Sequence, residues 1–404
     1  MNAFRKVFQR VYMFIFYKMT YLMNWRIPTI LSSTKDVPNK IKELNLDNCF
    51  LVIDPGILKL GLSDGLINAF NDLGINYHIF TQIEPNPKIK DIEAGVLEYI
   101  NSGSTCICAM GGGSAMDTAK AIGARIVRPN KSIEKLGGLL KVGRKIPLLF
   151  AIPTTAGTGS ETTIASVVTN EVTHHKYSIN DLHLIPSYAV LDASLTLGLP
   201  KSITSATGMD ALTHAIEGYL SLDVPKKYKR LAEEAIVDIL GNILTVYNDG
   251  SNYDARYKML YASFKAGCVF TRVGLTYCHP IAHTLGGLYS VPHGLANAVI
   301  LPHCLRHYGK KVYKKLAHLS DLCNLTNENM SLEEKAIAFI ERIEFLNKEM
   351  NLETKFDIKE EDIPQMIKWA EHEANSAYYP PVILDSKEIE AIIREVKLWK
   401  YVRS

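Results

Sequence analysis

The sequence predicts an α/β amino-terminal domain with a mainly parallel sheet, followed by an all-helical carboxyl-terminal domain. From about residue 45 to about residue 195, short β-rich runs alternate with helical stretches, which is typical of βαβ units. After Pro200 these runs stop, and long segments with a 3.6-residue period follow. We therefore expect three parts, an arm over 1–25, an α/β domain over 26–198 and a helical domain over 199–404.

The expected strands are rich in Val, Ile and aromatic residues and are bounded by Gly, Pro, Asn or Asp. They cover 50–53, 77–80, 106–110, 148–152, 164–168 and 188–191. In the helical half, two capping-box patterns mark helix starts, Ser331 with Glu334 and Asp385 with Glu388. No internal repeat or low-complexity linker separates the halves, so we expect two domains in close contact with a cleft between them.

The composition excludes several classes of protein. The chain has 404 residues, a net charge of +3 and 47% apolar residues. Disordered chains, fibrous repeats and proteins that coat nucleic acids all need a more lopsided composition. We therefore expect a soluble globular protein with no nucleic-acid partner.

The cysteines indicate a reducing compartment. There are seven, an odd number, and none forms a Cys-x-x-Cys pair. A zinc knuckle or a secreted disulfide framework is therefore disfavoured. We expect a cytoplasmic protein with free thiols.

The first 35 residues carry six basic side chains and no acidic one, which leaves a net −3 for the rest of the chain. At helical spacing Phe4, Val7, Phe8, Val11 and Ile15 share one face, and Arg5, Lys6, Gln9 and Arg10 lie opposite. The longest apolar run, 11–17, is far too short to span a bilayer. Three interpretations remain open: an arm packed on protein such as a partner subunit, a helix at a membrane surface, or a targeting presequence, which the absence of Ser before Ser32 disfavours.

A glycine-rich segment, 109–120, follows a predicted strand directly. Gly111, Gly112 and Gly113 allow a tight turn and a close approach to an anion. Ser114 is expected to cap the next helix, with Asp117 completing a box-like pair, and the free N–H groups there attract phosphate. A plain tight turn is the alternative.

The order of these residues differs from the usual dinucleotide fingerprint. The acidic residue, Asp54, ends the first strong strand and precedes the glycines instead of following them.

A second polar loop, 152–162, also follows a strand. Its hydroxyl groups, on Thr154, Thr155, Thr158 and Ser160, could bind phosphate or a carboxamide. The alternative is a simple connector rich in Ser and Thr. Because both loops follow neighbouring strands, they should meet at the carboxyl edge of the sheet, where open α/β folds bind ligands.

Two further segments carry the candidate metal ligands. Asp210 and His214 are four residues apart and share a helix face, although an ordinary Asp–His hydrogen bond also fits this spacing. His279 and His283 repeat the spacing, with Pro280 suited to a first helical turn. Gly286, Gly287 and Pro292 are expected to interrupt that helix, so His293 should come from the next loop or helix start.

Imidazoles together with one carboxylate suit a divalent transition metal. His303 and His307, which are also four apart, are interpreted as helix-surface residues or as residues behind the metal ligands.

With these four segments, the chain resembles the iron-containing (group III) alcohol dehydrogenase family over roughly residues 26–310. The resemblance implies the dehydroquinate synthase-like fold and an active site in the interdomain cleft. It implies metal ligation by Asp210, His214, His279 and His293, with Fe²⁺ as the ion; Zn²⁺ would bind such ligands as readily. It implies that His283, which is not a ligand in the family, lies near the nicotinamide.

The resemblance also implies a set of cofactor-contacting positions. These are Asp54, Asn86, Gly112, Gly113, Ser114, Asp117, Thr154, Thr155, Thr158 and Lys176. Asp54 should accept hydrogen bonds from the adenosine ribose and repel a 2′-phosphate, so NAD is expected over NADP.

The implied activity is hydride transfer between a small primary alcohol or aldehyde and NAD, with His283 relaying the proton. A homodimer and a peripheral membrane contact through 1–25 are further expectations.

Two features depart from the family pattern. The aromatic arm precedes the usual start, and Asn375-Ser-Ala-Tyr-Tyr-Pro-Pro381 stands where many members have Asn-Pro-Arg. Two alternative functions stay open: an NAD- and metal-dependent lyase of the dehydroquinate synthase type, which would need several basic residues around the cleft, and a membrane-surface scaffold without activity.

Overall fold

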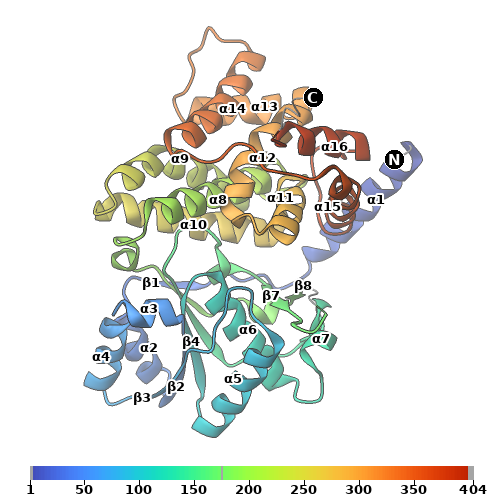
Figure 1. The fold of residues 1–404 in the computed structure, drawn as a ribbon. Helices are drawn as coiled ribbons and strands as arrows, with labels where there is room; N and C mark the ends of the chain where they lie inside the picture. Colours follow the sequence, from blue (N-terminus) through green and yellow to red (C-terminus); the bar gives the residue numbers. More distant parts are fainter. Residues whose placement is uncertain (1–2, 174–175, 399–404) are drawn as a thin grey trace, which may run out of the picture. The chain divides into compact units, whose positions relative to one another are not determined.

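The computed structural model describes residues 3–173 and 176–398, with side chains from Lys6 onward (Figure 1). The chain forms two compact units. One comprises Asn24–Gly198, and the other joins the N-terminal residues up to Met23 to the chain from Leu199 onward.

The first unit is built on a six-stranded sheet in which every pair of neighbours is parallel. Its order is β1-β9-β6-β4-β2-β3. The strands are β1 Thr29–Leu31, β2 Asn48–Ile53, β3 Asn76–Phe80, β4 Cys106–Gly111, β6 Leu148–Pro153 and β9 Tyr188–Val190. The predicted parallel sheet is confirmed.

Helices cover both faces of this sheet, because the central strands are apolar on both sides. On β2, Phe50 and Val52 belong to one buried cluster, while Leu51 and Ile53 belong to the other. The helices are α2 Asp36–Glu43, α3 Pro55–Lys59, α4 Asp64–Asp72, α5 Ile89–Ser102, α6 Gly113–Val127 and α7 Ile133–Leu136.

One predicted strand belongs to a different sheet. The 164–168 run forms β7 Ala165–Thr169, which pairs antiparallel with β8 Lys176–Asn180. With β5 Gly138–Leu139 they make a three-stranded sheet in the order β5-β8-β7. The sequence did not predict β8, whose partly exposed residues are mostly polar, or β1, which has only three residues.

The second unit is helical, as predicted. Its helices are α8 Lys201–Leu220, α9 Lys226–Asn248, α10 Tyr253–Val273, α11 Cys278–Tyr289, α12 His293–Tyr308, α13 Tyr313–Leu322, α14 Leu332–Glu349, α15 Ile363–Ala377 and α16 Ser386–Glu395. Both predicted capping boxes are present, before α14 and before α16. Short 3₁₀ helices cover Ser160–Thr162, Leu182–Leu184, Ala193–Thr196, Gly309–Lys311 and Glu360–Asp362.

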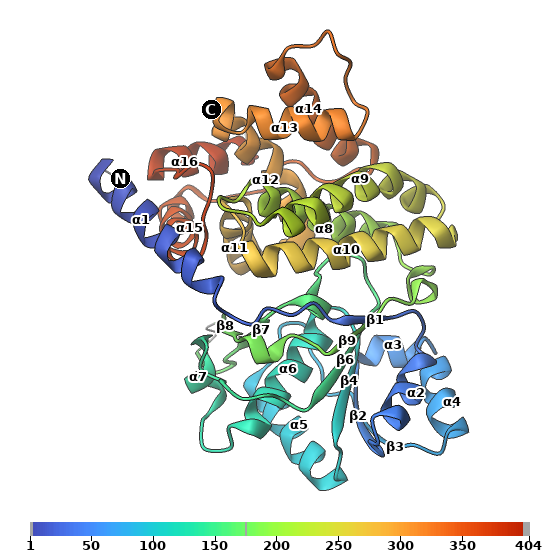
Figure 2. The same ribbon diagram turned by 180° about the vertical axis from the view of Figure 1, so that it is seen from behind.

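The N-terminal helix α1 (Ala3–Thr20) belongs to the helical unit and lies beside α15 (Figure 1, Figure 2). The predicted division into two faces is present, but the face that contacts protein carries Gln9 and Arg10 together with the buried Met13 and Tyr17. Val7, Phe8, Val11 and Ile15 of the opposite face are exposed, and the side chain of Phe4 lies outside the part of the chain that the structure describes. The helix therefore packs on its own chain, and that contact needs no partner subunit. Among the described residues, no helix is long and apolar enough to cross a membrane.

Candidate metal centre and nucleotide-binding loops

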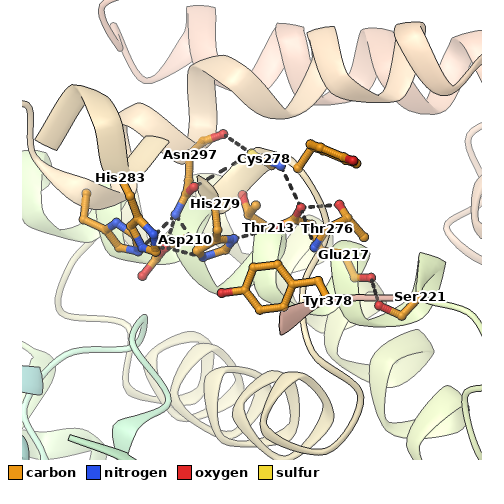
Figure 3. A network of polar contacts seen from close by, with 12 residues as sticks. Asp210, Thr213, Glu217, Ser221, Thr276, Cys278, His279, His283, Asn297 and Tyr378 are labelled. Carbon is orange, nitrogen blue, oxygen red and sulfur yellow. Dashed lines mark hydrogen bonds and ion pairs between the residues drawn. The ribbon is translucent and has the colours of Figure 1, made fainter. Parts of the chain in front are cut away.

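Three helices bring the four candidate metal ligands together. Asp210 and His214 project one turn apart from α8, His279 comes from the first turn of α11, and His293 is the first residue of α12. Figure 3 shows Asp210 and His279 beside Asn297. One ligand atom from each lies within 4.8 Å of all the others. Asp210, His214 and His279 are buried, and His293 is exposed, so the cluster opens on one side.

The helix breaks fall close to where the sequence placed them. Pro280 lies in the first turn of α11, as expected. The helix continues through Gly286 and Gly287 and ends at Tyr289, after which Pro292 precedes α12. Because α12 begins at His293, this side chain reaches the cluster from a helix start.

Glu217, which the sequence analysis missed, fixes the orientation of His279. One carboxylate oxygen is hydrogen-bonded to Nδ1 of His279. The other accepts from the backbone N–H groups of Thr276 at 3.0 Å and Cys278 at 2.9 Å. A carboxylate partner requires the proton on Nδ1, so the lone pair of Nε2 faces the cluster, as metal ligation requires.

A hydrogen-bond donor, the side-chain amide of Asn297, points into the centre of the cluster. The amide nitrogen of Asn297 lies 2.8 Å from Oδ1 of Asp210, 3.1 Å from Nε2 of His279 and 3.2 Å from Nε2 of His293. Three acceptors that converge on one point are the arrangement that a cation binds. The residues present therefore fit a divalent metal ion.

The electrostatics agree with this conclusion. Burial alone would raise the pKa of Asp210, but the imidazoles of His214, His293 and His279 lower it to about 2. Burial, with the neighbouring His214 and His293, holds the pKa of His279 well below its ordinary value. A charged carboxylate and a neutral imidazole are the protonation states that bind metal.

His283 lies beside the cluster and is exposed. Its ring stacks on His293 at 5.2 Å between centroids, and its Nδ1 lies 2.9 Å from Oε1 of Glu373. The hydroxyl of Tyr378 donates to the same Glu373 oxygen at 3.1 Å. Burial would raise the pKa of Glu373, but His283 and Tyr378 bring it below its ordinary value.

Two other predicted histidines lie outside the cluster. His303 and His307 both contact Glu395 of α16, at 2.7 Å and 3.1 Å. This agrees with a helix-surface position and joins α12 to α16.

In the α/β unit, the glycine-rich turn differs in one detail from the prediction. Helix α6 begins at Gly113 with Gly112 as its N-cap, and no side chain caps it, so Ser114 is not the cap and the expected box with Asp117 is absent. The box is absent because the carboxylate of Asp117 has other hydrogen-bond partners. Its carboxylate accepts from Ser160 Oγ at 3.0 Å and from the N–H of Val167 at 3.1 Å. The uncapped N-terminus keeps its N–H groups available for an anion.

The other predicted loop residues gather around this turn. Gly111 has a φ of +152°, and a Cβ there would lie 3.0 Å from the Cβ of Asp54. Thr154 donates its N–H to the carbonyl of Gly111 at 3.1 Å. A Cβ at Gly112 would meet only Thr155, at 4.0 Å, and one at Gly113 would meet Thr158 at 3.4 Å, which leaves a shallow backbone cradle.

Three of the remaining candidates already have partners. Asp54 caps α3, with Oδ1 accepting from the N–H groups of Gly56 at 2.8 Å and Ile57 at 3.3 Å. Lys176 donates to Asn86 at 2.7 Å, so two predicted cofactor residues meet across 90 positions of sequence.

Lys120 is a further residue that was not predicted from the sequence. Its buried ammonium group donates to Ser160, Thr163 and Ala165 and so ties α6 to the loop after β6. In the sequence, the one indication that the Lys120 side chain points inward is its helical spacing from the glycine-rich turn.

The missed residues at the metal centre differ in how predictable they were. Glu217 lies seven residues after Asp210, and Asn297 lies four after His293, so helical spacing could have found both. Glu373 comes from a distant helix and carries no such signal.

Comparisons with known proteins agree with this geometry. A family model described as iron-containing alcohol dehydrogenase matches residues 31–193, and a model of the C-terminal part of the Fe-containing alcohol dehydrogenase family matches residues 204–396. The 1,3-propanediol dehydrogenase of Klebsiella pneumoniae is 37% identical over 85% of this chain and 90% of that protein.

Solved structures give the same result. A crystal structure of a 1,3-propanediol oxidoreductase is 34% identical, with a TM-score of 0.88 over 92% of this chain and 98% of that chain. A sulfoacetaldehyde reductase from Bifidobacterium kashiwanohense, solved in complex with NAD⁺, is 27% identical with a TM-score of 0.82 over 93% and 99% of the two chains. The chain belongs to the iron-containing alcohol dehydrogenase family.

Proposed function

We propose that this protein transfers hydride between a small primary alcohol or aldehyde and NAD at a divalent metal ion. The observation that carries this is the convergence of ligand atoms from Asp210, His214, His279 and His293 within 4.8 Å of one another. The family relationship and the names of the similar proteins support the reaction class.

Each residue has a distinct task in this proposal. Asp210, His214, His279 and His293 would hold the metal ion, and Glu217 orients His279. When bound, the metal would act as a Lewis acid toward the alcohol oxygen, and NAD would supply the hydride acceptor. His283 is exposed beside the cluster, and it is the group that we assign to carry the released proton toward solvent.

The nucleotide would be held by the loops of the α/β unit. The uncapped N-terminus of α6, with Gly112, Gly113 and Ser114, suits a pyrophosphate. The other contacts are assigned to Asp54, Asn86, Asp117, Thr154, Thr155, Thr158 and Lys176. Asp117 would act through the Ser160 loop, because its carboxylate is hydrogen-bonded there.

Iron is the metal that we propose, on the strength of the family; intrinsic affinity alone would not separate Fe²⁺ from Zn²⁺. The alternative lyase chemistry is less well supported. Arg272, the basic residue nearest the metal segments in sequence, contacts Thr20 at 2.8 Å and the ring of Tyr21 at 4.5 Å, so it is engaged with the end of α1.

A cytoplasmic homodimer is the assembly that we propose. All seven cysteines are free, which suits a reducing compartment. Strand β1 forms one edge of the large sheet and offers backbone groups to a second copy. Light scattering should give twice the mass of the 404-residue chain; a monomer would refute this assembly.

We propose that the exposed face of α1 contacts an anionic membrane surface. Its apolar side chains have exposed fractions of 48–66% and belong to Val7, Phe8, Val11, Tyr12, Phe14, Ile15 and Met19. No acidic residue occurs before Asp36, so the segment does not repel anionic headgroups. Val11→Asp should abolish pelleting with phosphatidylglycerol vesicles; unchanged pelleting, or none by the unaltered protein, would refute the contact.

The activity is tested by following NADH absorbance over a series of short alcohols and aldehydes, under anaerobic conditions, with Fe²⁺ and Zn²⁺ in parallel. His279→Ala should lose both bound metal and turnover, whereas His303→Ala, a matched change outside the cluster, should keep both. Full turnover by metal-free protein would refute the proposal.

A further inference from the structure

The buried face of α1 is hydrogen-bonded to one short segment of the chain, residues 373–381. Gln9 donates to the side-chain oxygen of Asn375 at 2.7 Å. Arg10 donates to the carbonyl of Pro381 at 2.9 Å and also to that of Pro380. Tyr17, which is 5% exposed, donates to the carbonyl of Ala377 at 3.3 Å. Three side chains of α1 thus restrain the end of α15 and the chain beyond it.

The same segment reaches the metal centre from its other side. Glu373 contacts Nδ1 of His283, and Tyr378 donates to Glu373. Asn375, the residue that Gln9 holds, also accepts from the hydroxyl of Tyr277 at 2.8 Å. Tyr277 immediately precedes α11, the helix that carries His279 and His283.

Close packing joins the two sides. Gly274 has a φ of +74°, and a Cβ there would overlap the hydroxyl of Tyr17 and lie 3.2 Å from the ring of Tyr378. Tyr17 of α1 and Tyr378 of the segment therefore both pack against the backbone at Gly274, which has no side chain. Tyr17 also stacks on Tyr379, the residue after Tyr378, at 5.5 Å between ring centroids. A displacement of α1 would therefore remove contacts on both sides of Tyr378 in the chain.

His283 depends on such support because 43% of its side chain is exposed. An exposed imidazole can adopt several ring orientations unless its neighbours restrict it. We propose that α1 is a positioning element of the active site: through segment 373–381 it holds Glu373 and Tyr378 so that they fix the imidazole of His283. This inference rests on the proposed role of His283 in proton transfer.

The experiment uses a pair of near-isosteric changes in the full chain, Gln9→Met with Tyr17→Phe, which remove the hydrogen bonds that these side chains donate and keep the apolar packing. Tyr253→Phe, at an exposed tyrosine of α10 in the same unit, is the matched control. We expect kcat to fall about 10-fold, since small displacements of catalytic groups are costly, while metal content and the KM for NAD stay unchanged. In the metal-free protein, amide hydrogen exchange over 373–381 should be faster in the double variant than in Tyr253→Phe.

His283→Ala separates this inference from the proposed function. If His283→Ala keeps full kcat, the assigned role of His283 is wrong and the inference falls with it. If His283→Ala is impaired but the Gln9→Met/Tyr17→Phe variant has normal kcat and exchange, α1 has no positioning role, although the proposed function stands. A further 10-fold loss on combining all three changes would also overturn the inference, because the effect would not pass through His283.

Discussion

At the scale of single residues, the candidate metal site depends on side chains behind the four candidate ligands as well as on those four. Glu217 is buried, and its carboxylate is shared between His279 and the backbone of Thr276 and Cys278. It therefore fixes both the tautomer of His279 and the start of α11. Burial raises the pKa of Glu217 to about 7, although the hydrogen bonds from Thr276 and Cys278 oppose that rise.

Glu217→Gln should weaken metal binding by about 10- to 100-fold, because an amide cannot accept on both sides as the carboxylate does. Chelator competition measures the affinity. Glu233→Gln is the matched control, since Glu233 also pairs with a histidine, His318 at 3.0 Å, on the surface of the same unit. Equal metal affinity in the two variants would contradict the role of Glu217.

Asp54 offers a second test at this scale. Its carboxylate caps α3, so Asp54→Asn removes the charge while keeping an acceptor for the N–H of Gly56. If the charge repels a 2′-phosphate, kcat/KM with NADP should rise relative to NAD in this variant. Asp64→Asn, in the first turn of α4, controls for a general change in charge. An unchanged ratio would show that cofactor choice is made elsewhere.

At the scale of elements, a single lysine joins the pieces of the nucleotide-binding unit. Lys120 is fully buried in α6, and its ammonium group has five acceptors at 2.6–3.1 Å, from Ser160, Thr163 and Ala165. It links the helix that follows the glycine-rich turn to the loop that follows β6. Both proposed nucleotide-binding loops depend on this link.

Lys120→Met should destabilise the protein by about 3 kcal/mol, because the buried carbonyl groups lose their donor. The midpoint of thermal unfolding should then fall by roughly 6–12 °C, and calorimetry measures it. Lys131→Met controls for the loss of a lysine, since Lys131 donates to an exposed carbonyl, that of Lys141 at 3.0 Å. Equal midpoints in the two variants would contradict a structural role for Lys120.

At the scale of the whole molecule, the two units bury their thiols separately. Six of the seven cysteines are buried, and Cys323 is partly exposed. Burial raises the pKa of Cys323 to about 11, so little thiolate is present near neutral pH.

The native protein should therefore react with at most one equivalent of a thiol reagent, and with seven after unfolding without reductant. Counting the released chromophore checks both numbers. Fewer than seven equivalents after unfolding would reveal a disulfide and contradict the reduced state.

The sequence by itself determined the parallel sheet and the helical second half, because apolar runs between turn residues and long 3.6-residue periods are local marks. The i, i+4 spacing of Asp210 and His214 indicated a shared helix face but left a simple hydrogen bond open. The full set of four candidate metal ligands came from the resemblance to the family.

Only the tertiary structure decided which distant groups support them. Glu373 meets His283 from a helix 90 positions away, Lys176 meets Asn86 across the same separation, and the face of α1 that carries Gln9 turns inward onto segment 373–381. Helical periodicity divides α1 into two faces but does not state which one is covered. The far end of the chain decided this, because it buries Met13 and Tyr17 beside Tyr379 and accepts hydrogen bonds from Gln9 and Arg10.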